Sequence, residues 1–144
     1  MARAALHQQP SFNLFYYDQR VVPMYDGGYV LMWVLGWASA GTRESFARYF
    51  TPAGAMVSNI EMDETIFHSR IITAAPLPND RYIVLLIRDY SSLIFKVFAK
   101  NGTQLSQTVL PWYCGTGANE MGYAGNRVAI VDCSVSTAFI LRTY

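Results

Sequence analysis

The chain has few charged residues, little lysine and no long apolar run. Only 15% of its 144 residues are charged, and 11 Lys and Arg against 10 Asp and Glu give a formal net charge of +1. Nucleic-acid binding uses a basic surface, so from this balance we expect no nucleic-acid partner. The longest apolar run, Tyr29 to Ala40, is too short to cross a bilayer and is interrupted at Gly36. We therefore expect no membrane span.

Motifs that would indicate catalysis or metal binding are also missing. His7 and His68 lack the ligand spacing of a zinc site, and the sequence has no nucleophile elbow. Cys114 and Cys133 belong to no CxxC motif; they allow one disulfide or two free thiols, and we predict that they lie within disulfide range. The acidic run Glu61 to Glu64 lacks calcium-loop spacing, which favours a solvated acidic loop. We expect no cofactor, no metal and no enzymatic activity.

The polar residues are mostly uncharged. Lys96 and Lys100 are the two lysines against nine arginines, so Ser, Thr, Asn and Gln supply much of the polar surface, which favours an extracellular or cell-surface location. The N-terminal residues lack the apolar stretch of a signal peptide, so we expect none, or one already removed. Asn101 begins an Asn-Gly-Thr sequon and is a candidate glycosylation site, although Asn-Gly is first of all a hairpin-turn signal.

The sequence repeats itself three times, with a spacing close to a third of its length. The pairs aligned at an offset of 48 include Arg48 with Lys96, Phe50 with Phe98, and Gly54 with Gly102. A second alignment places residues 22–29 over residues 75–82 and again over residues 121–128. Periods of this size indicate a repeat architecture, in which each unit buries its apolar face against its neighbours.

Each repeat is built from short runs rich in Val, Ile, Tyr and Phe, bounded by turn residues, which is the signature of β-strands. The second run of each repeat is almost continuously apolar, as expected for a strand covered on both faces. These three runs are Tyr29 to Leu35, Tyr82 to Arg88 and Val128 to Cys133. We predict that they form the buried centre of the molecule through Val30, Met32, Ile83, Leu85, Ala129 and Val131.

Four antiparallel strands per repeat describe a β-propeller blade. The pattern GGYVLMW at 27–33, followed by FARYFTPAGAMVS at 46–58, resembles the tandem propeller-like repeats of bacterial and extracellular surface proteins. The resemblance implies an all-β fold of three four-stranded antiparallel sheets, as a half-ring or as part of a larger ring. We expect one domain over residues 1–144, with blades at approximately 14–60, 61–110, and 111–144 together with 1–8.

The phase of the repeat predicts association between chains. The third repeat ends at Tyr144, before its fourth strand, and Ala2 to His7 hold the position of that strand. Propellers carry four to eight blades, because fewer cannot close a ring. We predict that Ala138 to Tyr144 pairs with an N-terminal segment of its own or another chain. Two chains would then close a six-bladed ring. Alternatively, the missing blades come from other propeller or filament subunits or from a longer precursor.

The predicted binding surface is the end of the blades at which the long connections gather, since loops on a rigid scaffold often carry binding. These connections are Gln8 to Arg20, Glu61 to Arg70 and Pro111 to Glu120 between blades, and Gly36 to Glu44, Asp89 to Ser92 and Ser134 to Thr137 within them. A sugar site combines an aromatic platform with charged hydrogen-bonding groups. The candidate ligand-binding residues are Trp37, Arg43, Glu44, Arg88, Asp89, Trp112 and Tyr113.

These observations predict a non-enzymatic structural or adhesive module of an extracellular assembly, which closes its ring by oligomerisation. The alternative is a carbohydrate-binding propeller lectin with glycans as partners, in which the tryptophans bind sugar instead of packing between blades. A hydrolase is the third reading, and it would need a pair of carboxylates in the central channel.

Overall fold

The structure is a computed structural model that describes residues 14–37, 43–63, 69–88, 92–110, 120–124, 127–131 and 138–142. Every regular element within these residues is a β-strand. In chain order the strands are β1 (Leu14–Pro23), β2 (Tyr29–Trp37), β3 (Arg43–Phe50), β4 (Met56–Asp63), β5 (Ser69–Leu77), β6 (Arg81–Arg88), β7 (Ser92–Ala99), β8 (Gln104–Leu110), β9 (Glu120–Ala124), β10 (Arg127–Val131) and β11 (Ala138–Arg142). The predicted all-β class is therefore confirmed.

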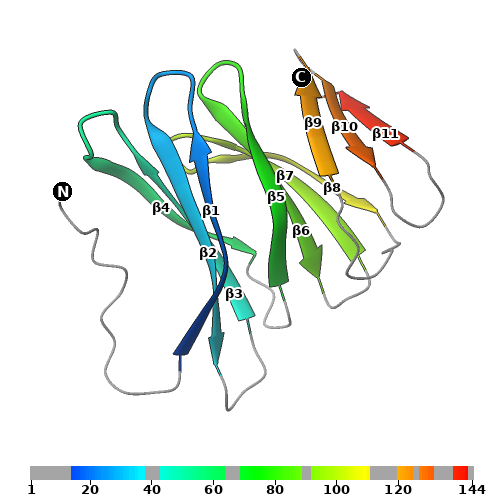
Figure 1. Cartoon of the computed structure of the whole chain (residues 1–144), viewed down its shortest axis with the longest axis horizontal. Coiled ribbons are helices and arrows are strands. Elements are labelled where there is room, and N and C mark those ends of the chain that lie inside the picture. Colours follow the sequence, from blue (N-terminus) through cyan, green and yellow to red (C-terminus); the bar gives the residue numbers. More distant parts are fainter. Residues whose placement is uncertain are drawn as a thin grey trace.

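The strands form three antiparallel sheets, each with its strands in chain order. Two sheets have four strands, β1–β4 and β5–β8, and the third consists of β9, β10 and β11. Figure 1 shows the three sheets side by side in chain order, with β5–β8 between the other two. The first strands of successive sheets are neighbours, since β1 contacts β5 and β5 contacts β9.

The strands extend into the predicted loops, and one predicted strand lies outside the described residues. The predicted loops Gly36 to Glu44 and Glu61 to Arg70 are wrong at both ends, because β2 ends at Trp37, β3 begins at Arg43, β4 ends at Asp63 and β5 begins at Ser69. The third sheet has three strands in the part of the chain that the structure describes, and the fourth strand expected from Ala2 to His7 lies outside that part, so its pairing stays a prediction. The predicted loop Gln8 to Arg20 is wrong over its second half, because β1 begins at Leu14. A bulge between Tyr17 and Arg20 lets β1 continue past polar residues that read as a loop.

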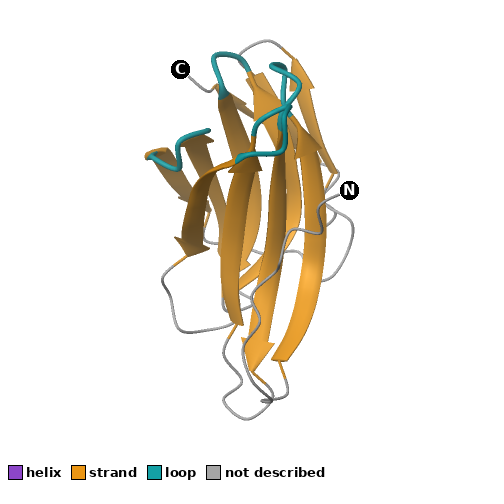
Figure 2. Ribbon diagram, turned by 90° about the vertical axis from the view of Figure 1, so that its left-hand side faces the viewer, coloured by secondary structure: helices purple, strands orange, loops and turns teal. Residues whose placement is uncertain are grey.

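Tight turns connect the strands at one end of the molecule, where Figure 2 shows them in teal. The β3–β4 and β7–β8 turns have the same hydrogen bonds: the Gly54 amide donates to the Thr51 carbonyl, and the Gly102 amide to the Ala99 carbonyl, both at 2.9 Å. Both glycines have positive φ, +83° and +93°, which explains why glycine occupies these positions. The predicted hairpin turn at Asn101 is confirmed.

The sheets pack face to face, and the β5–β8 sheet is apolar on both faces. One core cluster joins Val30 and Met32 of β2 to Val84 of β6, and a second contains Ile83 and Leu85 on the opposite face of β6. All five side chains are buried, as the continuous apolar runs predicted. The side chains of Ala129 and Val131, the other predicted core residues, lie outside the described part of the chain.

Residues aligned in the sequence occupy matching positions in the first two sheets. Tyr29 of β2 stacks on Phe50 of β3 with ring centroids 5.1 Å apart, and Tyr82 of β6 stacks on Phe98 of β7 at 5.5 Å. Each pair is in direct register across its two strands. Cross-strand aromatic pairs of this kind stabilise a sheet and fix its register.

Candidate functional site

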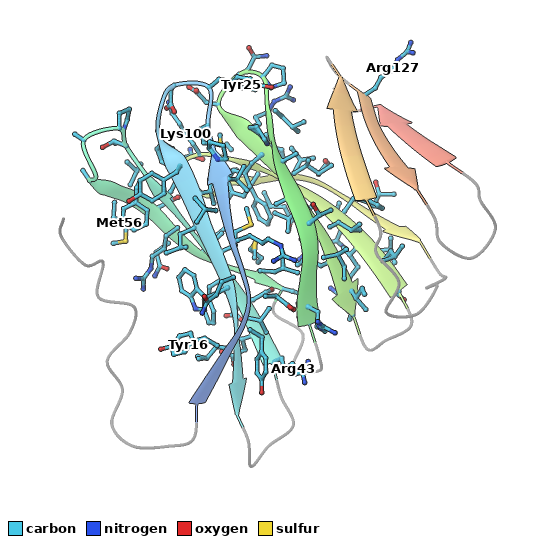
Figure 3. The ribbon with its side chains drawn as sticks, viewed as in Figure 1. Tyr16, Tyr25, Arg43, Met56, Lys100 and Arg127 are labelled. Atoms are coloured by element: carbon cyan, nitrogen blue, oxygen red, sulfur yellow. The ribbon has the colours of Figure 1, made fainter. Side chains whose placement is uncertain are left out.

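Four of the predicted binding residues are described, and they lie at the end of the sheets opposite the tight turns. Arg43 and Glu44 begin β3, and Arg88 ends β6. Trp37 ends β2, and its side chain lies outside the described part of the chain, as do all atoms of Asp89. The remaining candidates outside the described residues are Trp112, Tyr113, Cys114 and Cys133, so the predicted disulfide stays a prediction. We call this end the loop end; Figure 3 shows Arg43 there, far from Tyr25 at the turns.

Arg43 packs on an aromatic ring of its own sheet. Its guanidinium carbon lies 4.9 Å from the centroid of Tyr17, a favourable cation–π contact. The Tyr17 ring in turn covers Gly36, where a Cβ would come within 2.7 Å of the ring. Arg43 and Tyr17 therefore form a partly exposed patch on one face of the β1–β4 sheet, whereas the half-buried Glu44, the next residue of β3, lies on the other face.

The half-buried Arg88 forms an ion pair across the two sheets with the buried Asp63. Its Nη2 and Nε donate to the two carboxylate oxygens of Asp63, at 2.6 Å and 3.2 Å. Asp63 ends β4 and is 1% exposed, so the expectation of a solvated acidic loop is wrong at this residue, whereas Glu61 is exposed. A two-pronged guanidinium–carboxylate contact of this kind fixes orientation as well as distance.

Lys96 of β7 completes this buried polar group. Its ammonium donates to the Met62 carbonyl at 2.5 Å and lies 3.7 Å from Asp63, and Lys96 is only 5% exposed. The buried Ser69 hydroxyl donates to the Ser45 hydroxyl at 3.1 Å. Ser45 lies opposite Asp63 in register, and Ser69 lies opposite Arg88. We call Ser45, Asp63, Ser69, Arg88 and Lys96 the loop-end cluster. It joins the β1–β4 sheet to the β5–β8 sheet.

The first strands of the two sheets are also joined by polar contacts. The bulge in β1 places Asp18 at φ +50°, and its carboxylate accepts hydrogen bonds from Nε and Nη2 of Arg70 at 3.2 Å and 3.1 Å. Arg20 donates to the carbonyl of Ile72 at 3.3 Å. The polar residues of β1 that suggested a loop therefore bind β5.

A second polar group bridges the same two sheets at the turns. Lys100 lies 3.3 Å from Asp26 of the first sheet and 2.6 Å from Asp80 of its own. The Tyr49 hydroxyl donates to Asp26 at 2.5 Å, and the Gly28 amide donates to the same carboxylate at 2.9 Å. We call Asp26, Tyr49, Asp80 and Lys100 the turn-end cluster.

Hydrogen bonding shifts the titration of the turn-end cluster. The bond from Tyr49, followed by the bond from the Gly28 amide, lowers the pKa of Asp26 below its usual value. The same bond raises the pKa of Tyr49, and the hydrogen bond to Asp80 raises the pKa of Lys100. The ionic forms of Asp26 and Lys100 are thus stabilised together.

Both clusters use their charges to hold two sheets together. In the part of the chain that the structure describes, no group of three or more His, Cys, Asp or Glu residues is placed to bind a metal ion. Arg88, a candidate sugar-binding residue, has its guanidinium on Asp63, which leaves Arg43 and Glu44 as the described candidates on the surface. Asn101 is exposed, and its side-chain oxygen accepts the Thr103 amide at 3.1 Å.

Sequence reasoning missed the buried state of Lys96 and the role of Asp63. The available signal was the alignment of Lys96 with Arg48, which marks a cation at the same place in two repeats.

No helix among the described residues is long and apolar enough to span a membrane. Comparison of the chain with protein-family models, with curated proteins and with solved structures gave no match.

Proposed function

We propose that the chain is a non-enzymatic structural module whose three sheets are blades of a β-propeller. The observation that carries this proposal is the serial packing of the sheets, in which β1 contacts β5 and β5 contacts β9. Contacts between successive first strands are the arrangement expected when blades are set around a common axis. The charged groups of the loop-end and turn-end clusters support the same conclusion, because they bind sheet to sheet.

Three blades do not close a propeller ring, so the proposal includes further blades from an assembly or from a longer precursor. Ring closure by oligomerisation, with a second copy or with other propeller or filament subunits, would cover the sheet faces at the two ends of the series. The low lysine content and the polar surface of Ser, Thr, Asn and Gln favour an extracellular or cell-surface location, where such an assembly would have a structural or adhesive role.

Sedimentation equilibrium over a wide range of protein concentrations tests this proposal. We expect a species whose mass is a whole multiple of the 16.2 kDa chain and which persists on dilution. Negative-stain images of that species should show a ring. A well-folded protein that sediments as a single chain at every concentration would contradict the proposal.

The alternative function is carbohydrate binding at the loop end. It is favoured by the patch of Arg43 on Tyr17, which combines an aromatic ring with a charged hydrogen-bonding group. Isothermal titration with a panel of mono- and disaccharides tests it. Saturable binding that is lost in Arg43→Ala, and kept in the matched Arg48→Ala variant, would support the lectin alternative; no binding to any sugar would remove it.

A further inference from the structure

One face of the β1–β4 sheet is turned away from the β5–β8 sheet and carries rows of large side chains. We call it the outer face. Register places its side chains in three rows across the strands: Pro23, Tyr29, Phe50 and Met56; Val21, Leu31, Arg48 and Asn59; and Trp33, Phe46 and Glu61. Most of these side chains are apolar or aromatic, and Trp33 stacks on Phe46 with ring centroids 5.7 Å apart.

The β5–β8 sheet carries the same rows on the face that packs against the β1–β4 sheet. In register these rows are Pro76, Tyr82, Phe98 and Gln104; Ala74, Val84, Lys96 and Gln107; and Leu86, Ile94 and Val109. The members of these rows on β6 align with the outer-face residues of β2 at an offset of 53 residues. The members on β7 and β8 align with the outer-face residues of β3 and β4 at an offset of 48. The outer face therefore matches a face that is already an interface within this molecule.

The two faces differ in what covers them. In the β5–β8 sheet, Tyr82 and Val84 are fully buried against Val30 and Met32 of the neighbouring sheet. On the outer face, Val21 remains 64% exposed, whereas the matching Ala74 of β5 is half-buried. Figure 3 shows Met56 on the side of the molecule away from the β5–β8 and β9–β11 sheets.

Two aligned glycines mark the same difference. A Cβ on Gly102 would lie 2.5 Å from Cγ2 of Ile60, because the β7–β8 turn packs on β4 of the preceding sheet. A Cβ on Gly54, the matching residue of the β3–β4 turn, would have no heavy atom within 4 Å. The space that a preceding sheet fills at Gly102 is thus open at Gly54.

We propose that a second copy of this chain docks on the outer face, with its β9–β11 sheet in the position that β1–β4 takes against β5–β8. Within one chain the β9–β11 sheet lies on the far side of β5–β8, so it cannot reach that face (Figure 1). This inference rests on the proposed structural function and adds the surface and the partner. The complementary face is a sheet of this chain, because a sheet of this chain already covers the β6 and β7 members of the matching rows.

Arg48 occupies the place in this interface that Lys96 occupies in the internal one. The Lys96 ammonium donates across the sheet boundary to the Met62 carbonyl, on the last strand of the preceding sheet. Arg48 lies over the Trp33 ring at 5.0 Å and donates to Asn59 at 2.9 Å, which holds its guanidinium on the outer face. A cation at this position is suited to bind a carbonyl of the incoming sheet.

Sedimentation of two matched variants tests the surface. Val21→Asp places a charge on the outer face, and Leu105→Asp places one at a 50% exposed position of β8 that belongs to none of the rows. We expect Val21→Asp to keep the circular dichroism spectrum of the parent and to weaken association by at least about tenfold, and Leu105→Asp to associate like the parent.

Photo-cross-linking from position 56 identifies the occupant. A benzophenone amino acid at this position should form cross-links between isotope-labelled and unlabelled chains, to peptides of residues 120–142. Cross-links within one chain, or to β1–β4 of the second chain, would overturn the inference. Equal association of the parent and Val21→Asp would also overturn the inference, but it would not contradict the proposed structural function. A parent protein that never associates would reject both the inference and the proposed function.

Discussion

Gly54 and Gly102 hold the same place in consecutive hairpins, but only Gly102 is crowded by a neighbouring sheet. Both have positive φ, so an alanine is strained at either position. At Gly102 the new Cβ must also displace Ile60. We expect Gly102→Ala to destabilise the monomeric fold by about 1–3 kcal/mol more than Gly54→Ala, as overpacked sites do. Urea unfolding of the two variants measures the difference.

The double variant Gly102→Ala with Ile60→Ala supplies the control. Removing Cγ2 of Ile60 relieves the contact, so the two substitutions together should cost less than the sum of the single ones. Additive costs would show that the strain at Gly102 comes from its backbone conformation alone.

Asp63 is the anion of the loop-end cluster, and its removal should take a carboxylate away from two cations. Asp63→Asn keeps the size of the side chain but not its charge, beside Arg88 and Lys96. We expect the free energy of unfolding to fall by about 3–5 kcal/mol, as when one partner of a buried ion pair is removed. Glu61→Gln, on the same strand but exposed, is the matched control and should change stability by no more than about 0.5 kcal/mol. Equal stability of the two variants in urea would contradict the assigned role.

Tyr82 and Tyr49 should respond in opposite ways to loss of the hydroxyl group. The Tyr82 hydroxyl is fully buried with no hydrogen-bond partner among the described residues, and burial raises the pKa of this phenol. An unpaired buried hydroxyl destabilises a fold, so Tyr82→Phe should leave stability unchanged or raise it by about 1 kcal/mol. Tyr49→Phe removes the bond to Asp26 and should cost about 1.5–3 kcal/mol. Thermal and urea unfolding of both variants test this pair, and a strongly destabilised Tyr82→Phe would reveal a partner for that hydroxyl.

The turn-end cluster should make stability depend on acid pH. Because the folded state lowers the pKa of Asp26, the stabilisation is complete above the unfolded pKa of about 4 and is lost as the pH falls through the lower folded value. Carbon-13 NMR of the Asp26 carboxyl group should give a midpoint below the usual one, and Tyr49→Phe should move it back toward that value. A midpoint that does not respond to Tyr49→Phe would show that this hydrogen bond is not the main cause.

Much of the local structure could be predicted from the sequence. The turn glycines, the apolar second strands and the aligned aromatic pairs predicted strands, hairpins and the buried residues Val30, Met32, Ile83 and Leu85, because these features depend on short-range geometry and alternation. The extent of β1 could not be predicted. Asp18 and Arg20 look like loop residues until β5, more than 50 positions away in the sequence, supplies Arg70 and the Ile72 carbonyl.

The sequence by itself determined the strand pattern, the equivalence of Arg48 with Lys96 and the low net charge. Only the tertiary structure decided what that equivalence means: Lys96 is buried against Met62 and Asp63, whereas Arg48 lies on the outer face. The physical reason is that burial and ion pairing depend on which sheet lies opposite a residue. A repeat encodes the same face twice, and the position of each copy in the series sets whether that face is covered.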